Sequence, residues 1–366
     1  MEFDIALIGY EEGENLGLRY ISSYLQSKSV KTIILPYSPL TKENILSSLL
    51  KYNPKIVGFS LIFQRMLNDF NELLVFLRDN NVSSHFTMGG HFPSIEPEKV
   101  INFLKPLDSI IRCEGEHTIY ELYQNIDNHN NWKEIKGLVY RNGDEIIINK
   151  YRKLIENLNE LPFPIRNPKP YTHRNIGLST ILTGRGCYYN CCFCSIHEFY
   201  RDSEGKRRRR RSPSNVVEEI QILYEKQNVR IIVFEDDDFP LKGKINVEWI
   251  KIFLSELKKK QILNKIIWRL STRIDEIDKS ILHLMKRSGL ISVYIGIEAG
   301  NDSSLKKFKK KYSVKDIHNT VHSFIELGLS FEFGFMILHP YCSIQTIETD
   351  LVFLKEISNT GLTNIH

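Results

Sequence analysis

The chain has 366 residues, of which 42% are hydrophobic and 25% charged, with a formal net charge of +5 at pH 7. These values are typical of a soluble globular protein that is long enough for two domains. Its N-terminal stretch MEFDIALIGYEEG has acidic residues where a signal peptide needs basic ones, and no run approaches the roughly 18 apolar residues of a membrane helix. We therefore expect a cytoplasmic protein with reduced thiols, in which clustered cysteines indicate metal ligands or catalytic groups.

Strand-like and helix-like patterns alternate along the first part of the chain. Strands are expected at 3–10, 31–38, 56–63 and 85–90, with helices at 15–28, 41–52 and 67–81. A further strand and helix are expected within 108–126. This order predicts a parallel, doubly wound α/β sheet, which binds ligands at the carboxyl ends of its strands.

Residues 137–149 have the pattern of a β-hairpin with Asn142-Gly143-Asp144 at its turn. The stretch 157–170 is rich in proline and asparagine, which is typical of a linker. We therefore divide the chain into a Rossmann-like domain over 1–135, a hairpin and linker over 136–172, and a second domain over 173–366.

The second domain shows its own alternating series. Strands are expected at 178–184, 229–236, 265–272, 291–300 and 329–338, with helices at 213–227, 246–260, 277–289, 313–328 and 344–358. Such repeats predict a partial (β/α)6 barrel of the TIM type, with its chemistry at the C-terminal ends of the strands. The sixth strand would start near Thr363, so we expect a barrel that is truncated near this strand.

Four of the six cysteines lie within 187-CYYNCCFC-194, in the loop after the first barrel strand. Thiolates suit iron–sulfur clusters and zinc. Cys187, Cys191 and Cys194 can hold three irons of a [4Fe–4S] cluster and leave the fourth iron open to another ligand. A structural zinc site completed by His197 and simple burial of the cysteines are the alternatives. Cys192 interrupts the pattern and is interpreted as a packing residue.

Several stretches together resemble one known family. The CxxxCxxC spacing, with Phe193 before the last cysteine, is similar to that of the radical S-adenosylmethionine (SAM) superfamily. The stretches RSPSNVVEEI, VFEDDDF and YIGIEAG resemble the branch of this superfamily that has an N-terminal cobalamin-binding domain. The resemblance implies that the three cysteines hold a [4Fe–4S] cluster whose open iron binds SAM. An electron from the cluster would cleave SAM to methionine and a 5′-deoxyadenosyl radical.

The resemblance also implies SAM contacts at the ends of the barrel strands. Phe193 would pack near the adenine, and the acidic run 235–238 could receive the SAM ammonium group, although such a run can also be a solvated turn. The expected contacts are Phe193, Asp236, Asp237, Ser271, Arg273, Gly296, Glu298 and Met336. Ser271 and Arg273 could equally be ordinary strand-end polar residues, and His339 could be functional or structural.

The first domain resembles the cobalamin-binding fold. The residues expected to line the cleft for the nucleotide tail are Ser60, Leu61, Gly89, Gly90 and His91. The segment 10-YEEGENLG lacks the histidine that coordinates cobalt in many such domains. The group below cobalt could be a water or another side chain, for which Gln64 and Arg65 are candidates. A domain that binds nothing is the alternative.

The two halves together imply a radical SAM enzyme that uses cobalamin to methylate an unactivated carbon of a small-molecule, peptide or natural-product substrate. Flavodoxin or ferredoxin would be the electron donor. The alternatives are a cobalamin-dependent cyclase or rearrangement enzyme, and an inactive remnant or a subunit completed by a partner. A methylthiotransferase would need three further cysteines in the first domain, where Cys113 is the only cysteine before Cys187.

The arginine run 207–211 also needs an interpretation. Arg211 and Arg209 are expected to contact carboxylates or a cofactor phosphate internally, and the other arginines to be solvated. The run lacks the interleaved aromatic residues of a single-strand binding surface, so nucleic acid is not the expected partner.

Overall fold

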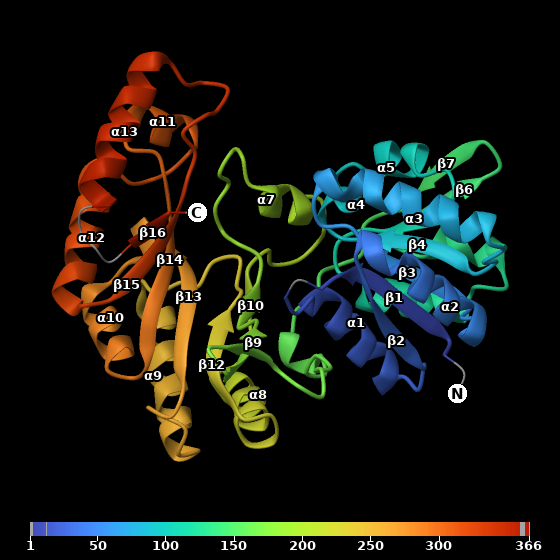
Figure 1. Cartoon of the computed structure of the whole chain (residues 1–366), viewed down its shortest axis with the longest axis horizontal. Helices are drawn as coiled ribbons and strands as arrows, with labels where there is room; N and C mark the ends of the chain where they lie inside the picture. Colours follow the sequence, from blue (N-terminus) through green and yellow to red (C-terminus); the bar gives the residue numbers. More distant parts are fainter. Residues whose placement is uncertain (1–2, 12, 359–362, 366) are drawn as a thin grey trace. The chain divides into compact units, whose positions relative to one another are not determined.

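The computed structural model describes residues 3–11, 13–358 and 363–365. It divides into two compact units (Figure 1): Met1–Asn167 with Glu198–Arg207 form the first, and Pro168–His197 with Arg208–His366 form the second. A segment that follows the cysteine loop in sequence therefore belongs to the first unit. Within the described ranges, no helix has both the length and the apolar character needed to cross a membrane.

The first unit is built on a sheet with the strand order β2-β1-β3-β4-β5-β6-β7. Its parallel strands are β1 (Ile5–Tyr10), β2 (Thr32–Tyr37), β3 (Ile56–Ser60), β4 (His85–Gly89) and β5 (Ser109–Ile111). The order 2-1-3-4-5 is one of the two common orders of doubly wound sheets. The α/β sheet predicted from the alternating patterns is therefore confirmed.

Helices cover both faces of this sheet. They are α1 (Leu16–Ser27), α2 (Lys42–Tyr52), α3 (Leu67–Asp79), α4 (His91–Ile95), α5 (Pro97–Phe103) and α6 (Glu116–Gln124). Leu18 of α1 and Leu122 of α6 belong to one buried cluster, whereas Leu49 of α2 and Phe70 of α3 belong to another. The helices α1, α2, α3 and α6 each bury apolar side chains against the sheet, as the helical periodicity of the sequence predicts.

The predicted hairpin extends the first sheet. Strand β6 (Leu138–Asn142) is antiparallel to both β5 and β7 (Glu145–Ile148). Gly143 has φ +62° in the two-residue turn, which suits the turn types of tight hairpins. The stretch expected to be a linker packs on α1 of the same unit, since Arg19 Nη1 donates to the carbonyl of Ile165 at 3.2 Å.

The second unit has the sheet order β16-β15-β14-β13-β12-β9-β8 within the described residues. Six of these strands run parallel: β9 (Ile176–Ile181), β12 (Val229–Phe234), β13 (Ile267–Arg273), β14 (Leu290–Glu298), β15 (Ser330–Phe335) and β16 (Thr363–Ile365). The short β8 (Tyr171–His173) is antiparallel to β9. Because β8 and β16 lie at opposite ends of this order, the sheet is an open, partial barrel. Its sixth parallel strand starts at Thr363, where the sequence predicts it.

The barrel helices follow the parallel strands. They are α8 (Pro213–Lys226), α9 (Lys244–Lys259), α10 (Lys279–Lys286), α11 (Asp302–Lys307), α12 (Val314–Leu327) and α13 (Ile344–Ser358). Ser212 caps α8 by accepting from Asn215 N, with Pro213 in the first turn, as its sequence predicts. Phe234, Trp268 and Phe333 belong to one continuous core between strands and helices.

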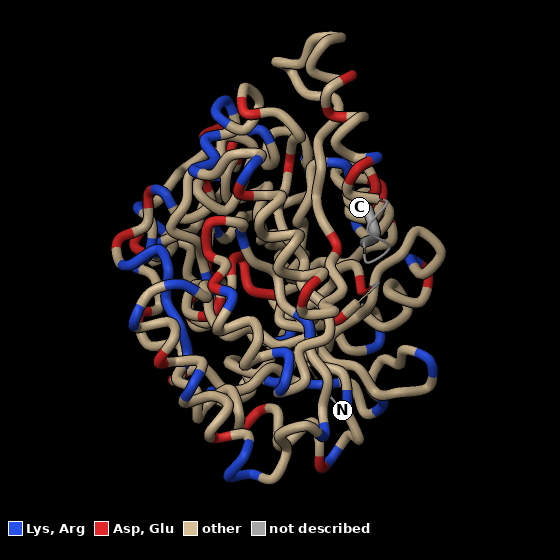
Figure 2. Tube along the Cα trace, turned by 90° about the vertical axis from the view of Figure 1, so that its left-hand side faces the viewer, with Lys and Arg blue, Asp and Glu red and all other residues tan. Residues whose placement is uncertain are grey.

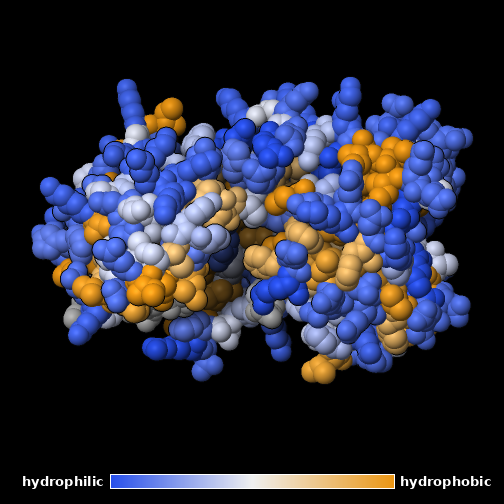
Figure 3. All heavy atoms as spheres, turned by 90° about the horizontal axis from the view of Figure 1, so that it is seen from above, coloured by the Kyte–Doolittle hydropathy of each residue, from blue (hydrophilic) through white to orange (hydrophobic). Residues whose placement is uncertain are grey.

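Charged residues of both signs are distributed along the chain. In Figure 2 basic and acidic positions are interspersed along most of the trace. In Figure 3 the face seen from above is mostly hydrophilic, with separate apolar groups. The large exposed apolar side chains include Leu338 and Ile344, each 78% exposed, around the start of α13.

Candidate cofactor sites

The loop with the four cysteines leaves the C-terminal end of the first parallel strand. After β9 the chain forms β10 (Gly184–Arg185), which pairs with β11 (Arg209–Arg210), and then runs through the cysteines into α7 (Ser195–Tyr200). The amide of Gly186 donates to Asp237 Oδ2 at 2.7 Å, which ties the loop to the end of the second barrel strand. The loop thus lies where a (β/α) barrel carries its chemistry.

Three of the four thiols in this loop are half-buried, and Cys192 is exposed. The interpretation of Cys192 as a packing residue is therefore wrong. Burial, followed by the charge of Asp238, raises the pKa of Cys187 to about 12. Burial also raises the pKa of Cys194, with Cys191 as a further cause. Cys194 in turn affects Cys187, so the three thiols lie within electrostatic range of one another.

The thiol side chains are soft ligands that suit either zinc or an iron–sulfur cluster. In the described part of the chain, no three His, Cys, Asp or Glu side chains converge as ligands of one metal ion. In a zinc site the thiolates and His197 would bind one ion, whereas the thiolates of a four-iron cluster would bind different irons. A bound metal also supplies the positive charge that keeps a coordinating thiol deprotonated despite burial.

The three aspartates after the second barrel strand have different surroundings. The Asp236 carboxylate is buried and accepts from Thr183 N at 3.1 Å and from Thr183 Oγ1 at 2.8 Å. Asp237 accepts from the amide of Gly186. Asp238 is only 2% exposed, and neither of its carboxylate oxygens has a hydrogen-bond partner among the described residues. The predicted contacts Asp236 and Asp237 are thus engaged within the protein, and Asp238 has unused acceptors.

Burial raises the pKa of Asp238 to about 7, and Glu276 is the next cause. A buried carboxylate without hydrogen bonds is costly, and such groups are enriched at functional sites. The sequence does not distinguish Asp238 from its acidic neighbours, because only the fold determines which carboxylate is left without hydrogen bonds.

Glu298 ends β14 in a strained conformation, with φ +69°. Its Oε1 accepts from Lys310 Nζ at 2.9 Å, and the two side chains are 13% and 3% exposed, respectively. A Cβ atom at Gly296 would overlap Glu298 Oε1, so the small residue leaves room for the carboxylate. The carbonyl of Glu298 accepts from the amide of Met336 at 2.9 Å.

Lys310 also connects this strand end to the cysteine loop. Its Nζ lies 5.2 Å from the centre of the Phe193 ring, a cation–π distance. Phe193 itself is 44% exposed and packs edge-on against Phe308. The structure therefore brings together the predicted SAM contacts Phe193, Gly296, Glu298 and Met336.

Arg273 ends β13, and its guanidinium is already engaged. Nη1 donates to Cys191 Sγ at 3.1 Å, and Nε and Nη2 donate to the two carboxylate oxygens of Asp275 at 2.8 and 2.9 Å. The carbonyl of the other predicted contact on this strand, Ser271, accepts from Phe239 N at 2.9 Å.

The arginine run is mostly internal. Arg211 donates to Glu219 Oε2 at 2.6 Å with both side chains buried, so its predicted contact with a carboxylate is confirmed. The expectation of solvated neighbours is wrong for Arg208, which lies 3.7 Å from Asp236 Oδ1 and is buried. It is also wrong for Arg210, which stacks 3.6 Å from the centre of Trp249. This part of the chain pairs with β10 through β11, so the side chains of Arg208 and Arg210 lie inside the second unit rather than in solvent.

The residues predicted for cobalamin lie at the carboxyl ends of β3 and β4. Leu61 is fully buried, and its amide donates to the carbonyl of Gly89 at 2.9 Å. Gly90 has φ +112°, and a Cβ atom there would overlap the carbonyl of Leu61. His91 stacks on Phe199 of the segment Glu198–Arg207, with ring centres 4.4 Å apart. The backbone of Ser60, Leu61, Gly89 and Gly90 thus lies at the carboxyl ends of β3 and β4. Burial lowers the pKa of His91 to about 4.

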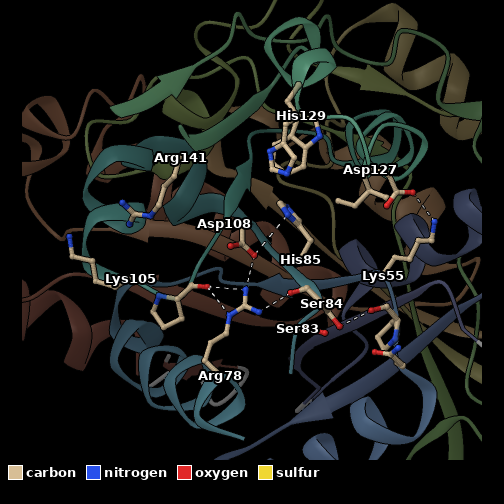
Figure 4. A pocket seen from close by; sticks show the side chains of 15 residues that line it. Lys55, Arg78, Ser83, Ser84, His85, Lys105, Asp108, Asp127, His129 and Arg141 are labelled. Carbon is tan, nitrogen blue, oxygen red and sulfur yellow. Dashed lines mark hydrogen bonds and ion pairs between the residues drawn. The ribbon is translucent and has the colours of Figure 1, made fainter. Parts of the chain in front are cut away.

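Two cavities lie elsewhere in the first unit. The larger, of about 850 Å³, is shown in Figure 4 at the edge where β3, β4 and β5 begin. Its Arg78 pairs with Asp108 at 2.7 Å and its Lys55 with Asp127 at 3.1 Å. This is the edge opposite to the one where doubly wound sheets bind ligands. A smaller cavity of about 450 Å³ is lined by Gln64 and Arg65, with Leu67, Asn68 and Phe103.

Two family models match successive parts of the chain, and the second of them includes the segment Glu198–Arg207 that packs with the first unit. Residues 6–123 match the B12 binding domain, and residues 181–354 match the radical SAM superfamily. Together these domains imply a [4Fe–4S] cluster, SAM and cobalamin as cofactors, in agreement with the sequence analysis.

The chain is also similar to individual proteins. It is 28% identical to an uncharacterized methyltransferase, PH0819, from Pyrococcus horikoshii over 94% of this chain and 74% of that protein. It is 26% identical to an anaerobic magnesium-protoporphyrin IX monomethyl ester cyclase from Cereibacter sphaeroides over 68% of this chain and 41% of that protein. Thus the chain spans less than half the length of this second relative.

The fold resembles that of the radical SAM methyltransferase TsrM from Kitasatospora setae. The TM-score is 0.80 at 16% identity, covering 99% of this chain and 72% of that structure. The similarity extends over both units.

Proposed function

Because the chain joins a B12-binding domain to a radical SAM domain, we propose that it is a cobalamin-dependent methyltransferase that acts on an unactivated carbon. When bound, the cluster would supply the electron that cleaves SAM to a 5′-deoxyadenosyl radical, and cobalamin would supply the methyl group. The substrate would be a small molecule, a peptide or a natural product, and a flavodoxin or ferredoxin would donate electrons.

The single observation that carries this proposal is the grouping of three half-buried thiols with an unpartnered carboxylate. Cys187, Cys191 and Cys194 would hold the cluster, and Asp238 would accept hydrogen bonds from the ammonium group of SAM. An ammonium group would give the buried carboxylate the hydrogen-bond donors that it lacks among the described residues, and would add to the positive charge of Arg208 and Arg273.

The other strand ends would hold the rest of SAM. Glu298 would accept from a ribose hydroxyl while Lys310 neutralises its charge. Phe193 and Met336 would flank the adenine. Lys310, which pairs with Glu298 at the end of β14, lies over the Phe193 ring, and the amide of Met336 donates to the carbonyl of Glu298. In the first unit, the backbone of Ser60, Leu61, Gly89 and Gly90 would approach the nucleotide tail of cobalamin, with His91 held neutral beside it.

A cobalamin-dependent cyclase is the second candidate. The similarity to an anaerobic cyclase favours it, since the same radical could serve ring closure when no methyl group is delivered.

The test is an anaerobic incubation of the reconstituted protein with cobalamin, a low-potential reductant and SAM labelled in its methyl group. We expect a bound corrinoid spectrum, 5′-deoxyadenosine, and label in the corrinoid fraction. The Cys191→Ala variant should form no 5′-deoxyadenosine, whereas Cys192→Ala, which changes an exposed thiol, should form as much as wild type. A corrinoid-loaded, iron-containing wild type that makes no 5′-deoxyadenosine would contradict the proposal, and 5′-deoxyadenosine without label transfer would favour the cyclase.

A further inference from the structure

Arg273 contacts the cysteine loop at two points. Its Nη1 donates to Cys191 Sγ at 3.1 Å, and its guanidinium carbon lies 3.5 Å from the centre of the Tyr189 ring. Tyr189 lies between Cys187 and Cys191 in the sequence. Arg273 of β13 therefore contacts both Cys191, which would bind the proposed cluster, and Tyr189, which lies between two of the cysteines.

The orientation of this guanidinium is fixed by neighbours that do not belong to the loop. Asp275 accepts from Nε and Nη2 in a bidentate pair, which is the most directional geometry available to arginine. The Tyr189 ring is held in turn, because its hydroxyl donates to Glu276 Oε1 at 2.6 Å. Because Asp275 binds Nε and Nη2, the Nη1 group is left to donate to the Cys191 sulfur.

The contact is shielded from water. Arg273 is 7% exposed, and Asp275 lies on the side of the guanidinium away from Nη1. A hydrogen bond in such surroundings is electrostatically stronger than one in water. The ion pair as a whole is neutral, yet it presents its positive end to the sulfur.

We propose that Arg273 is a positioning residue that fixes the Cys191 sulfur and raises the reduction potential of the cluster this sulfur would hold. The inference rests on the proposed function. Hydrogen bonds to ligating sulfurs and nearby charge are among the factors that set iron–sulfur potentials. A positive end near the sulfur favours the reduced state, which carries one more negative charge. The step concerned is the addition of one electron from a flavodoxin- or ferredoxin-type donor, with no bond made or broken.

This role differs from the SAM contact expected from the sequence. A SAM-binding arginine would alter the affinity for SAM and leave the potential of the SAM-free cluster unchanged. A residue bound to the sulfur would alter the potential before SAM is added. The two roles therefore separate in one experiment.

The experiment is a potentiometric titration of the reconstituted, SAM-free protein, followed by electron paramagnetic resonance of the reduced cluster. Arg273→Gln should make reduction about tenfold less favourable, which is about 59 mV for a one-electron couple. Arg273→Lys should shift the potential in the same direction by less, because a single ammonium keeps the charge but cannot form both the bidentate pair and the sulfur contact. Arg269→Gln is the matched control, since Arg269 lies on the same strand and pairs with Glu332 at 3.1 Å; it should leave the potential unchanged.

An unchanged potential in Arg273→Gln at wild-type iron content would overturn the inference, most clearly if SAM binding were weakened. If Arg273→Gln fails to fold, an unchanged potential in Arg273→Lys would do the same. Failure of the proposed function would look different, because the wild-type protein itself would then take up no cluster or would not cleave SAM.

Discussion

At the scale of single residues, burial without a partner distinguishes Asp238 from the aspartates before it. We predict that Asp238→Asn weakens SAM binding by about 10- to 100-fold, because a hydrogen bond to a charged group contributes about 1.5–3 kcal/mol. The same change should leave the SAM-free protein as stable as wild type or more so, since it removes a buried charge without hydrogen bonds. Equilibrium dialysis with SAM and a thermal melt measure the two effects; a variant that binds SAM normally would remove Asp238 from the site.

A second residue-scale prediction concerns pH. Burial lowers the pKa of His85 from 6.5 to about 3, with His129 and Arg78 as further causes, while Asp108 lies 3.9 Å away. Because the folded value lies below the unfolded one, the unfolded chain takes up a proton that the folded chain does not. The free energy of unfolding should therefore fall by about 1.4 kcal/mol per pH unit from this residue as the pH falls from 6.5 toward 3. Between pH 7 and pH 5 the contribution averages about 1 kcal/mol per unit, so urea titrations at these two values should give a slope that is larger in wild type than in His85→Gln by about this amount; equal slopes would contradict it.

At the scale of elements, the strand pair β10–β11 holds the cysteine loop against the barrel end. A Cβ atom at Gly184 would overlap the guanidinium of Arg208 and lie 2.5 Å from the carbonyl of Arg209. We predict that Gly184→Ala separates this pair and lowers the iron content after reconstitution. Gly17→Ala on α1 is the control, since the nearest neighbour of its Cβ atom would be the side-chain oxygen of the N-cap residue Asn15 at 3.5 Å, and it should be neutral or stabilise that helix by up to about 1 kcal/mol. Wild-type iron content in Gly184→Ala would show that the loop does not depend on this strand pair.

The elements also show which parts of the structure the sequence can predict. The parallel strands and the long helices of both units were predicted because each has a periodic apolar pattern over many residues. The pair β10–β11 was not, because strands of two residues carry no period. The burial of Arg208 and Arg210 was missed for a related reason: arginine is usually exposed, and only the fold places carboxylates and Trp249 beside them.

Some residues of the candidate site can be predicted from the sequence, and others only from the fold. The thiols were predictable from their spacing, and Glu298 from the resemblance, because both lie in short motifs. The contacts of Asp238, Lys310 and Arg273 join strand ends far apart in the sequence, and no local pattern indicates them.

At the scale of the whole molecule, the segment Glu198–Arg207 makes the first unit depend on residues outside its own half of the chain. Phe199 is 7% exposed and stacks on His91, and its carbonyl accepts from Cys113 Sγ at 3.0 Å. We predict that Phe199→Ala lowers the free energy of unfolding of the first unit by about 3–5 kcal/mol. Trp132 is buried in this unit, and its fluorescence in a Trp249→Phe, Trp268→Phe background reports the unfolding of the first unit in a urea titration. Leu40→Ala, at a side chain 91% exposed, should change the value by less than about 0.5 kcal/mol; an equally small effect of Phe199→Ala would contradict the assignment of this segment.

The measurement that tests the central claim most directly is the iron and sulfide content of the protein after anaerobic reconstitution. The wild type and Cys192→Ala should each hold about four irons and four sulfides per chain. Cys187→Ala, Cys191→Ala and Cys194→Ala should each lose most of both, while their circular dichroism stays like that of wild type. Four irons retained in any of these three variants, or none in the wild type, would contradict the account.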